Sequence, residues 1–72
     1  MMAKFYYYNK NVDSNGNHEV HSENCSYLPN YNNRIMIGYE NDCKSAIERA
    51  KRETGKTNFD GCWHCSFECH IG

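Results

Sequence analysis

Five cysteines and four histidines are the residues of this 72-residue chain whose types could do chemistry. In the segment 61–70, GCWHCSFECH, Cys62 and Cys65 form a Cys-x2-Cys pair, and such a pair on a tight turn points two thiolates at one centre. Upstream, His21 and Cys25 are spaced His-x3-Cys and can supply a second pair. Tetrahedral zinc takes four ligands of these types at about 2.0–2.3 Å. The pattern therefore predicts a zinc site that joins distant parts of the chain.

The fourth ligand of this site, beside Cys25, Cys62 and Cys65, has several candidates. Its candidates are His21, Cys69, His70 and His64. His21 is preferred because its spacing from Cys25 bends a loop around one centre. Cys69 would make an all-thiolate site, with His70 as a further alternate, whereas His64 lies inside the Cys62–Cys65 knuckle and is expected to splay outward. The sequence leaves Cys69 and His70 open as alternates.

The Cys-x2-Cys pair also permits a redox interpretation, because such a pair at a helix start lowers the pKa of one thiol. Thioredoxin-like pairs open a long helix, however, and only seven residues follow Cys65. A further alternative is a set of unrelated thiols with one disulfide. The sequence lacks Gly-x-Ser-x-Gly, His-Glu-x2-His and phosphate-binding glycine motifs. Four protein ligands leave zinc no open position for water, so a non-enzymatic role is favoured over an enzymatic one.

Length and charge limit the classes of protein to consider. A chain of 72 residues makes one small domain, 1–72. A domain of this size buries only about 60% of its unfolded surface, so disulfides or a bound metal are expected to stabilise it. The odd number of cysteines favours metal over complete disulfide pairing. The net charge of −1 gives no global attraction to nucleic acid, and no apolar run approaches a membrane span. We therefore expect a cytoplasmic monomer in a reducing environment, with no membrane association.

Local patterns predict a small α+β domain. Strands are expected over 4–9, 18–21 and 34–39, paired in a short antiparallel sheet, with a turn at Asn15-Gly16. One main helix is expected over 42–54, capped by Asp42 or Asn41 and stopped by Gly55. Its apolar stripe has the helical spacing and consists of Cys43, Ala46, Ile47 and Ala50.

The same patterns predict which side chains are buried. Cys43 is expected as a small core residue rather than as a ligand or nucleophile. In the third strand Ile35, Ile37 and Tyr39 share one face, which is a candidate for the core. Tyr27 and Leu28 should pack inward beside the metal.

The order of these motifs resembles a known family. His-x3-Cys-x-Tyr-Leu-Pro at 21–29, then Asn-Arg and an aliphatic strand ending in Gly, then an Ala-containing helix, and then Gly-Cys-x2-Cys at 61–65 resemble the metal-binding domain of the Ada methylphosphotriester-repair protein. They are also similar to Ada-like zinc modules appended to some bacterial nucleases. The resemblance covers about residues 18–65 and implies one zinc ion held by His21, Cys25, Cys62 and Cys65.

One departure from the family changes the expected function. In the Ada protein the first ligand is the cysteine that accepts a methyl group from DNA, and here that position is His21. Zinc-bound imidazole is not an equivalent nucleophile. The resemblance therefore implies the fold and the metal, and we expect a zinc-binding interaction module without the repair activity.

The partner of such a module is expected to be nucleic acid or another protein. Nucleic acid would use exposed tyrosines and the basic residues around the helix, which are Lys44, Arg49, Lys51, Arg52 and Lys56. Two alternatives are a thiol-dependent enzyme or methyl acceptor, and metal sensing or storage through the surplus ligands Cys69 and His70. Fe(II) is a chemical competitor of zinc for mixed thiolate and imidazole ligands.

Overall fold

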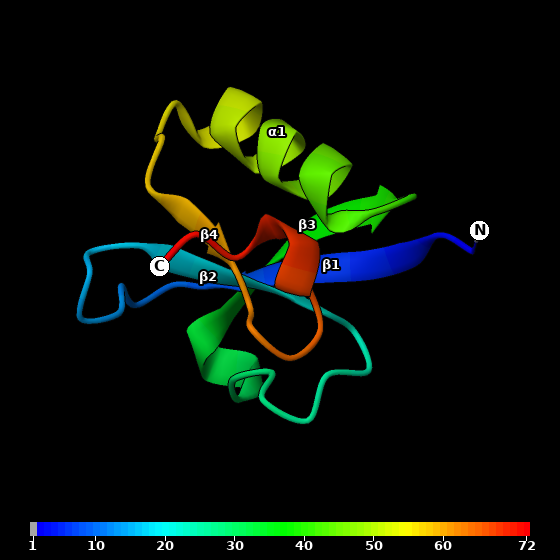
Figure 1. Ribbon diagram of the computed structural model, residues 1–72, viewed down its shortest axis with the longest axis horizontal. Helices are drawn as coiled ribbons and strands as arrows, with labels where there is room; N and C mark the ends of the chain where they lie inside the picture. The colour runs from blue at the N-terminus through cyan, green and yellow to red at the C-terminus, as the bar shows by residue number, and fades with distance from the viewer. Residues whose placement is uncertain (1) are drawn as a thin grey trace.

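A four-stranded sheet and one helix form the fold of the computed structural model, which describes residues 2–72 (Figure 1). The elements in chain order are β1 (Lys4–Asn9), β2 (His18–Ser22), the 3-10 turn η1 (Tyr31–Asn33), β3 (Arg34–Glu40), α1 (Cys43–Thr54), β4 (Phe59–Gly61) and the 3-10 turn η2 (Phe67–Cys69). The strand order in the sheet is β3-β1-β2-β4. This arrangement confirms the α+β class.

The sheet is mixed, whereas the sequence predicted an antiparallel one. β1 pairs antiparallel with both β2 and β3, and β4 pairs parallel with β2. The strand β4 was not predicted, because its three residues are too few to show a period of two. All three are nevertheless buried, and the parallel pairing places the residues after β4 beside the end of β2.

The core lies between the sheet and α1. Tyr6 and Tyr8 are buried on one face of β1, and Phe5 on the opposite face is 38% exposed. The buried core residues from the other elements are Val20, Ile37, Cys43, Ala46, Ala50 and Phe59. The predicted helix stripe is thus confirmed, with Ile47 partly buried at its margin.

The ends of α1 are capped as the sequence predicted. The Asp42 carboxylate accepts a hydrogen bond of 2.8 Å from the Ser45 backbone N–H. At the other end Gly55 has a φ of 74°, and its N–H donates to the Lys51 carbonyl oxygen at 2.9 Å. Only glycine adopts this left-handed conformation readily, so the helix stops there.

A β-bulge overturns the predicted core face of β3. Tyr6 pairs with Gly38 and Tyr7 pairs with Met36, so Ile37 is an extra residue in β3. An extra residue interrupts the alternation of side chains across the sheet. Ile37 is consequently buried, but Ile35 is 42% exposed and Tyr39 is 59% exposed.

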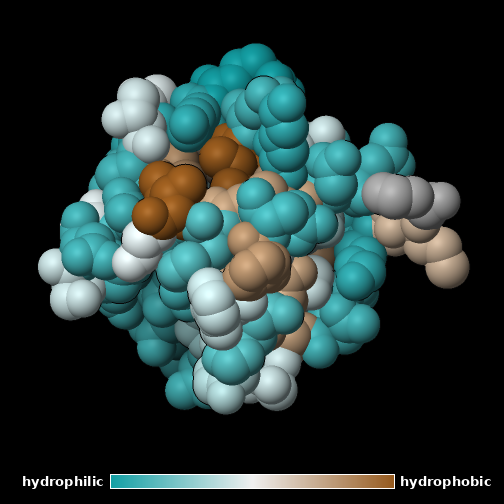
Figure 2. All heavy atoms as spheres, viewed as in Figure 1, coloured by the Kyte–Doolittle hydropathy of each residue, from teal (hydrophilic) through white to brown (hydrophobic). Residues whose placement is uncertain are grey.

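The helix and the long loops occupy opposite sides of the sheet. In Figure 1 α1 lies above the strands, whereas η1 and the loops that contain residues 23–30 and 62–66 lie below them. Figure 2 shows that hydrophilic atoms cover most of this view and that hydrophobic atoms gather in small patches below the helix. Within residues 2–72, no helix is long and apolar enough to cross a membrane.

A disulfide between Cys43 and Cys69 fastens the start of α1 to η2. Cys69, which the sequence left open as an alternate metal ligand, is instead the disulfide partner of Cys43. Cys43 is buried as predicted, but it is covalently bonded as well. The pairing could not be read from local spacing, because the two residues are 26 positions apart and meet only when η2 packs on α1.

Candidate metal centre

The four preferred ligands of the sequence analysis come together in the structure. One potential ligand atom from each of His21, Cys25, Cys62 and Cys65 lies within 4.8 Å of the others. The Sγ atoms of Cys25 and Cys62 are 3.8 Å apart. Two thiolates bound to one tetrahedral zinc at 2.3 Å are separated by about 3.8 Å. The four residues therefore lie close enough to bind one metal ion.

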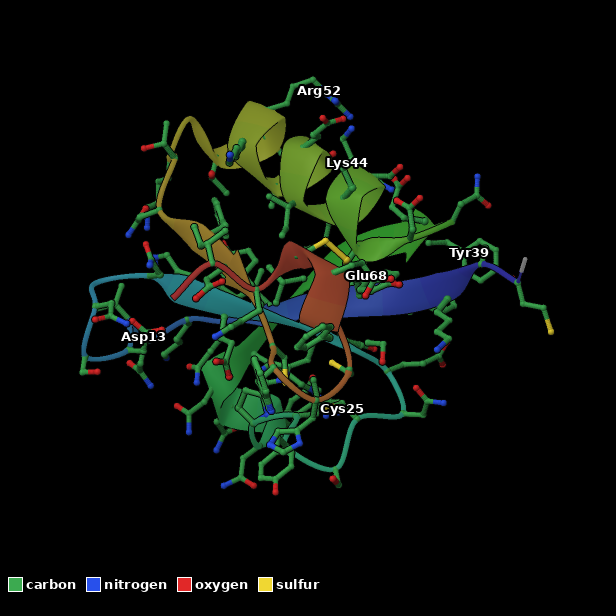
Figure 3. All side chains as sticks on the ribbon, in the orientation of Figure 1. Asp13, Cys25, Tyr39, Lys44, Arg52 and Glu68 are labelled. Carbon is green, nitrogen blue, oxygen red and sulfur yellow. A yellow bond between two sulfur atoms is a disulfide. The ribbon has the colours of Figure 1, made fainter. Side chains whose placement is uncertain are left out.

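Backbone pairing between β2 and the end of β4 brings the two ligand pairs together. The Cys62 N–H donates to the Val20 carbonyl oxygen at 2.9 Å and so continues the parallel ladder by one residue. On the other side the Cys25 N–H donates to the Ser22 carbonyl oxygen at 3.2 Å, which turns the chain back after β2. In Figure 3 Cys25 lies on the side of the sheet opposite Lys44 of α1.

Each of the three cysteine sulfurs accepts a hydrogen bond from a backbone N–H. The donors are Tyr27 for Cys25 at 3.4 Å, His64 for Cys62 at 3.4 Å, and Ser22 for Cys65 at 3.3 Å. Such donors favour the charged thiolate form and orient a ligand toward its metal. The turns around the site are thus arranged for anionic sulfur.

His21 supplies the most specific feature of the centre. Its side chain is almost fully buried, and its Nδ1 atom has no hydrogen-bond partner in the described part of the chain. Its Nε2 atom lies 3.3 Å from Oε1 of Glu19. A buried polar atom without a partner costs about 1–3 kcal/mol, and a carboxylate on the second ring nitrogen is the usual support of a metal-bound histidine.

Glu19 was not singled out as a functional residue from the sequence. The signal that could have found it is its spacing from His21, because residues i and i+2 of a strand lie on the same face.

Burial and hydrogen bonding separate the pKa values of the three thiols. Burial raises the pKa of Cys62 to about 12, and burial also raises the pKa of Cys25. Burial acts in the same direction on Cys65, but the neighbouring His21 side chain and the hydrogen bond from the Ser22 N–H outweigh it and lower its pKa to about 6. A divalent metal would displace the remaining protons, because thiolates are its ligands.

The other candidate residues lie outside this set. His64 is exposed and its ring stacks on Tyr27, with centroids 4.0 Å apart, so it splays outward as predicted. Tyr27 itself is 58% exposed, which contradicts the expectation that it packs inward. His70 Nδ1 lies 2.9 Å from the Gly61 carbonyl oxygen, and His70 is not among the described residues whose ligand atoms come together.

Four protein ligands around one centre leave no position for a substrate or for a reactive water. The arrangement is therefore suited to a structural metal rather than to hydrolysis. No protein-family model, curated protein or solved structure matches this chain. The assignment of the site consequently depends on its own geometry.

Proposed function

We propose that this chain is a non-enzymatic, structural zinc-binding domain of the Ada-like type, with one ion held by His21, Cys25, Cys62 and Cys65. The observation that carries the proposal is the buried, unpartnered Nδ1 of His21 beside three sulfurs that each accept a backbone N–H. One cation would satisfy the nitrogen and neutralise the sulfurs together. Three thiolates and one imidazole in a tetrahedral arrangement favour zinc, with Fe(II) as the competitor.

The small core supports a structural role for the ion. The proposed ligands tie the end of β2 and the loop that follows it to the chain after β4. Structural zinc contributes an apparent ~10–16 kcal/mol in small zinc-finger peptides, which is comparable with the whole stability of a domain, about 5–15 kcal/mol. Metal binding would therefore decide whether this region of the chain is ordered.

Two alternative functions have less support. A methyl acceptor of the Ada kind requires a nucleophilic thiolate at the first ligand position, which His21 occupies. Metal storage requires surplus ligands, but Cys69 is in a disulfide and His70 contacts the Gly61 carbonyl oxygen. The proposed four-ligand site has neither a thiolate at its first position nor, among the described residues, surplus ligands beside it.

Native mass spectrometry on protein purified without chelators tests the zinc proposal. We expect one zinc ion per chain, lost in His21→Ala and retained in the matched variant His64→Ala, which removes an exposed histidine from the Cys62–Cys65 knuckle. A metal-free parent protein, or equal metal content in both variants, would contradict the proposal. More than one ion per chain would favour storage.

A second candidate function, binding of single-stranded nucleic acid, is favoured by a hollow on the helix-free side. Its volume is about 520 Å³, and its lining residues are Tyr7, Tyr31, Asn32, Arg34 and Met36. The Arg34 guanidinium lies 5.1 Å from the centroid of the Tyr7 ring, and the Tyr31 side chain is 83% exposed. Single-stranded nucleic acid uses this combination, because bases stack on aromatic rings while cations neutralise phosphates.

The basic helix surface expected from the sequence is a weaker candidate for this role, because α1 carries no aromatic side chain on which a base could stack. One of its cations is also already paired. Arg49 lies 3.1 Å from a carboxylate oxygen of Glu40 and 3.1 Å from one of Glu53. Arg34, by contrast, forms no ion pair with the described residues. Its charge is therefore available to a phosphate.

Fluorescence anisotropy with labelled single-stranded oligonucleotides over a salt series tests this second function. We expect Tyr31→Ala to weaken binding by about 5-fold to 100-fold, since one stacked base contributes about 1–3 kcal/mol. Arg34→Gln should weaken binding and reduce its salt dependence. Arg52→Gln on α1 is the matched control and should have a smaller effect. Binding that is insensitive to Tyr31 and Arg34 would remove this candidate.

A further inference from the structure

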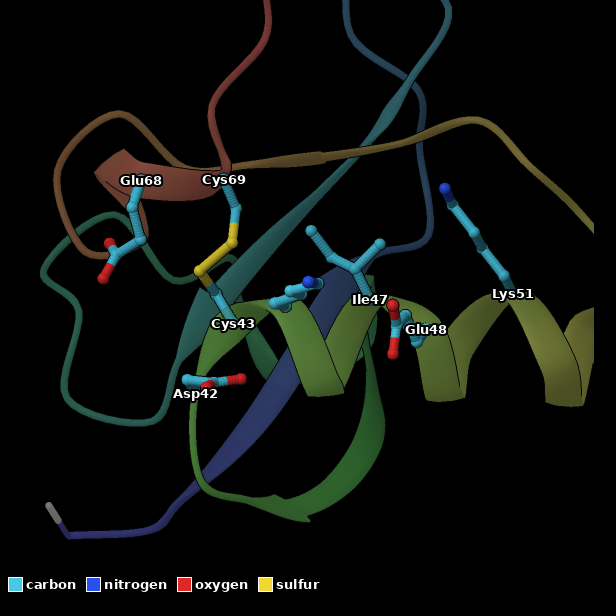
Figure 4. Close-up of a pocket in the computed structure, with 8 residues that line it drawn as sticks. Asp42, Cys43, Ile47, Glu48, Lys51, Glu68 and Cys69 are labelled. Carbon is cyan, nitrogen blue, oxygen red and sulfur yellow. A yellow bond between two sulfur atoms is a disulfide. The ribbon is translucent and has the colours of Figure 1, made fainter.

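The Cys43–Cys69 disulfide lies in an open groove between α1 and η2. The groove has a volume of about 520 Å³. Figure 4 shows the disulfide joining the two walls, with Ile47 and Lys51 farther along α1 and Glu68 beside Cys69. A bond that lines a groove of this size can be reached by a reagent from solution.

The two sulfurs of this bond have different surroundings. Cys43 is 3% exposed and is the first residue of α1, whereas Cys69 is partly exposed. Exchange begins when a thiolate attacks one sulfur and expels the other, and it is faster when the expelled thiolate is stabilised. A helix N-terminus stabilises a thiolate through its free N–H groups and its dipole. The attacked sulfur is therefore Cys69 and the leaving sulfur is Cys43.

Backbone contacts connect this disulfide to the proposed zinc ligands. The Cys69 N–H donates to the Ser66 carbonyl oxygen at 2.9 Å, and the Ser66 N–H donates to the Cys62 carbonyl oxygen at 2.9 Å. Ser66 is fully buried between them. A Cβ added to Gly61 would lie 2.6 Å from Cβ of Cys69, so the two segments touch directly. Residues 62–69 thus form one packed unit that carries two ligands and the attacked sulfur.

We propose that the Cys43–Cys69 disulfide is a thiol–disulfide exchange site for a dithiol reductant, and that its reduction speeds metal release from the knuckle. This inference rests on the proposed zinc site. The covalent bond holds residues 62–69 against α1, and reduction leaves that end attached by non-covalent contacts alone. Excursions of the segment then separate Cys62 and Cys65 from the other two ligands more often.

The exchange balances as a two-electron transfer. One thiolate of the reductant bonds to Cys69 Sγ as the Cys43–Cys69 bond breaks, and Cys43 leaves as a thiolate that takes a proton. The second reductant thiolate then displaces Cys69 Sγ from the mixed disulfide, and Cys69 is protonated in turn. The products are two thiols on this chain and one disulfide on the reductant.

A chelator challenge on the zinc-loaded protein tests the coupling. Zinc transfer to a chromogenic chelator is followed before and after treatment with reduced thioredoxin as the dithiol probe, and mass spectrometry scores the disulfide. We expect reduction to speed release on the order of 10-fold to 100-fold, since the bond closes a loop of moderate length. Complete reduction with an unchanged release rate would overturn the coupling, and a disulfide inert to the probe would overturn the exchange site.

Variants separate this inference from the zinc proposal. Cys69→Ser should release zinc as fast as the reduced parent and should not respond to the probe. Glu68→Gln, on the same groove wall, keeps both cysteines and should respond as the parent does. A metal-free parent refutes the zinc proposal and with it the release step, whereas a zinc-loaded parent with an inert disulfide refutes the present inference alone. If Cys69→Ser does not fold, comparing zinc release from the parent protein before and after reduction still tests the inference.

Discussion

Two sulfur-containing regions hold the same C-terminal segment. Between α1 and η2, Cys43 and Cys69 share a covalent bond. Near the ends of β2 and β4, Cys25, Cys62 and Cys65 stay unpaired next to His21. Cys65 and Cys69 are only four residues apart, so their different fates are not a matter of local spacing. The surrounding elements place Cys69 next to Cys43 and place Cys65 next to His21, Cys25 and Cys62.

The two regions should also stabilise the protein by different routes. A disulfide acts mainly by restricting the unfolded chain. A metal centre acts on the native state, because its ligands are assembled only there. A chelator should therefore act on the metal centre and a reductant on the disulfide. If the reductant also speeds metal release, or the chelator also exposes the disulfide, the size of that effect measures how tightly residues 62–69 couple the two regions.

Removal of the metal should have the largest effect. In the proposed centre one cation is the common partner of the buried His21 Nδ1 and the three sulfurs, and its removal leaves all four without it. We expect chelation to reduce the free energy of unfolding by several kcal/mol, up to the ~10 kcal/mol that structural zinc can supply. Circular dichroism and NMR dispersion with and without chelator measure this. Spectra that stay native after verified metal loss would contradict a structural role for the ion.

Loss of the disulfide should have the next largest effect. For a cross-link between residues 26 positions apart, Cys43→Ser is expected to cost about 2–4 kcal/mol. Denaturant unfolding of the zinc-loaded parent and variant gives the value. Equal stability of the two proteins would mean that the metal centre alone holds residues 62–69 in place.

Gly61 lies where the two regions meet, so Gly61→Ala should disturb both. The added Cβ would lie 2.6 Å from Cβ of Cys69 and 2.6 Å from the Ser66 carbonyl oxygen, which is closer than atoms pack. Overpacking of this kind costs about 1–3 kcal/mol. The expected result is lower thermal stability together with faster zinc release. Gly16→Ala is the comparison variant, because its Cβ would meet no atom within 4 Å and only its positive φ of 79° is strained.

Glu19→Gln should weaken the metal centre while leaving the disulfide region unchanged. The Glu19 carboxylate lies beside Nε2 of His21, and loss of such a support lowers metal affinity about 10-fold to 100-fold. Competition with a chelator of known affinity measures the change. An unchanged affinity would indicate that the buried ring of His21 is oriented by packing alone.

The smallest predicted effect is a pH dependence at the start of α1. The hydrogen bond from the Ser45 backbone N–H lowers the pKa of Asp42 below its ordinary value. A carboxyl group whose pKa is lower in the folded state stabilises the protein above its unfolded pKa and loses this contribution as pH falls through its folded pKa. The stability difference between the parent and Asp42→Ala should therefore disappear in acid. Measuring it at fixed metal occupancy keeps loss of zinc from obscuring the result.

The sequence by itself determined the elements that depend on local physics. The period of Cys43, Ala46 and Ala50 predicted the helix and its buried face, and Asp42 and Gly55 predicted its ends. The bounds of β1 were predicted correctly, and those of β2 and β3 to within one residue. The gathering of His21, Cys25, Cys62 and Cys65 was predicted as well, because the spacings of cysteine and histidine that suit one tetrahedral ion are few.

Only the tertiary structure decided the features that depend on distant partners. The parallel pairing of β4 with β2 exists because three buried residues meet a strand about 40 positions earlier in the chain, and this pairing brings Cys62 toward Cys25. The bulge at Ile37 exposes Ile35 and Tyr39, since side-chain alternation depends on the register with β1. The position of Cys69 also depended on a distant partner. Its chemistry permitted metal ligation, but the packing of η2 on α1 placed its sulfur next to Cys43.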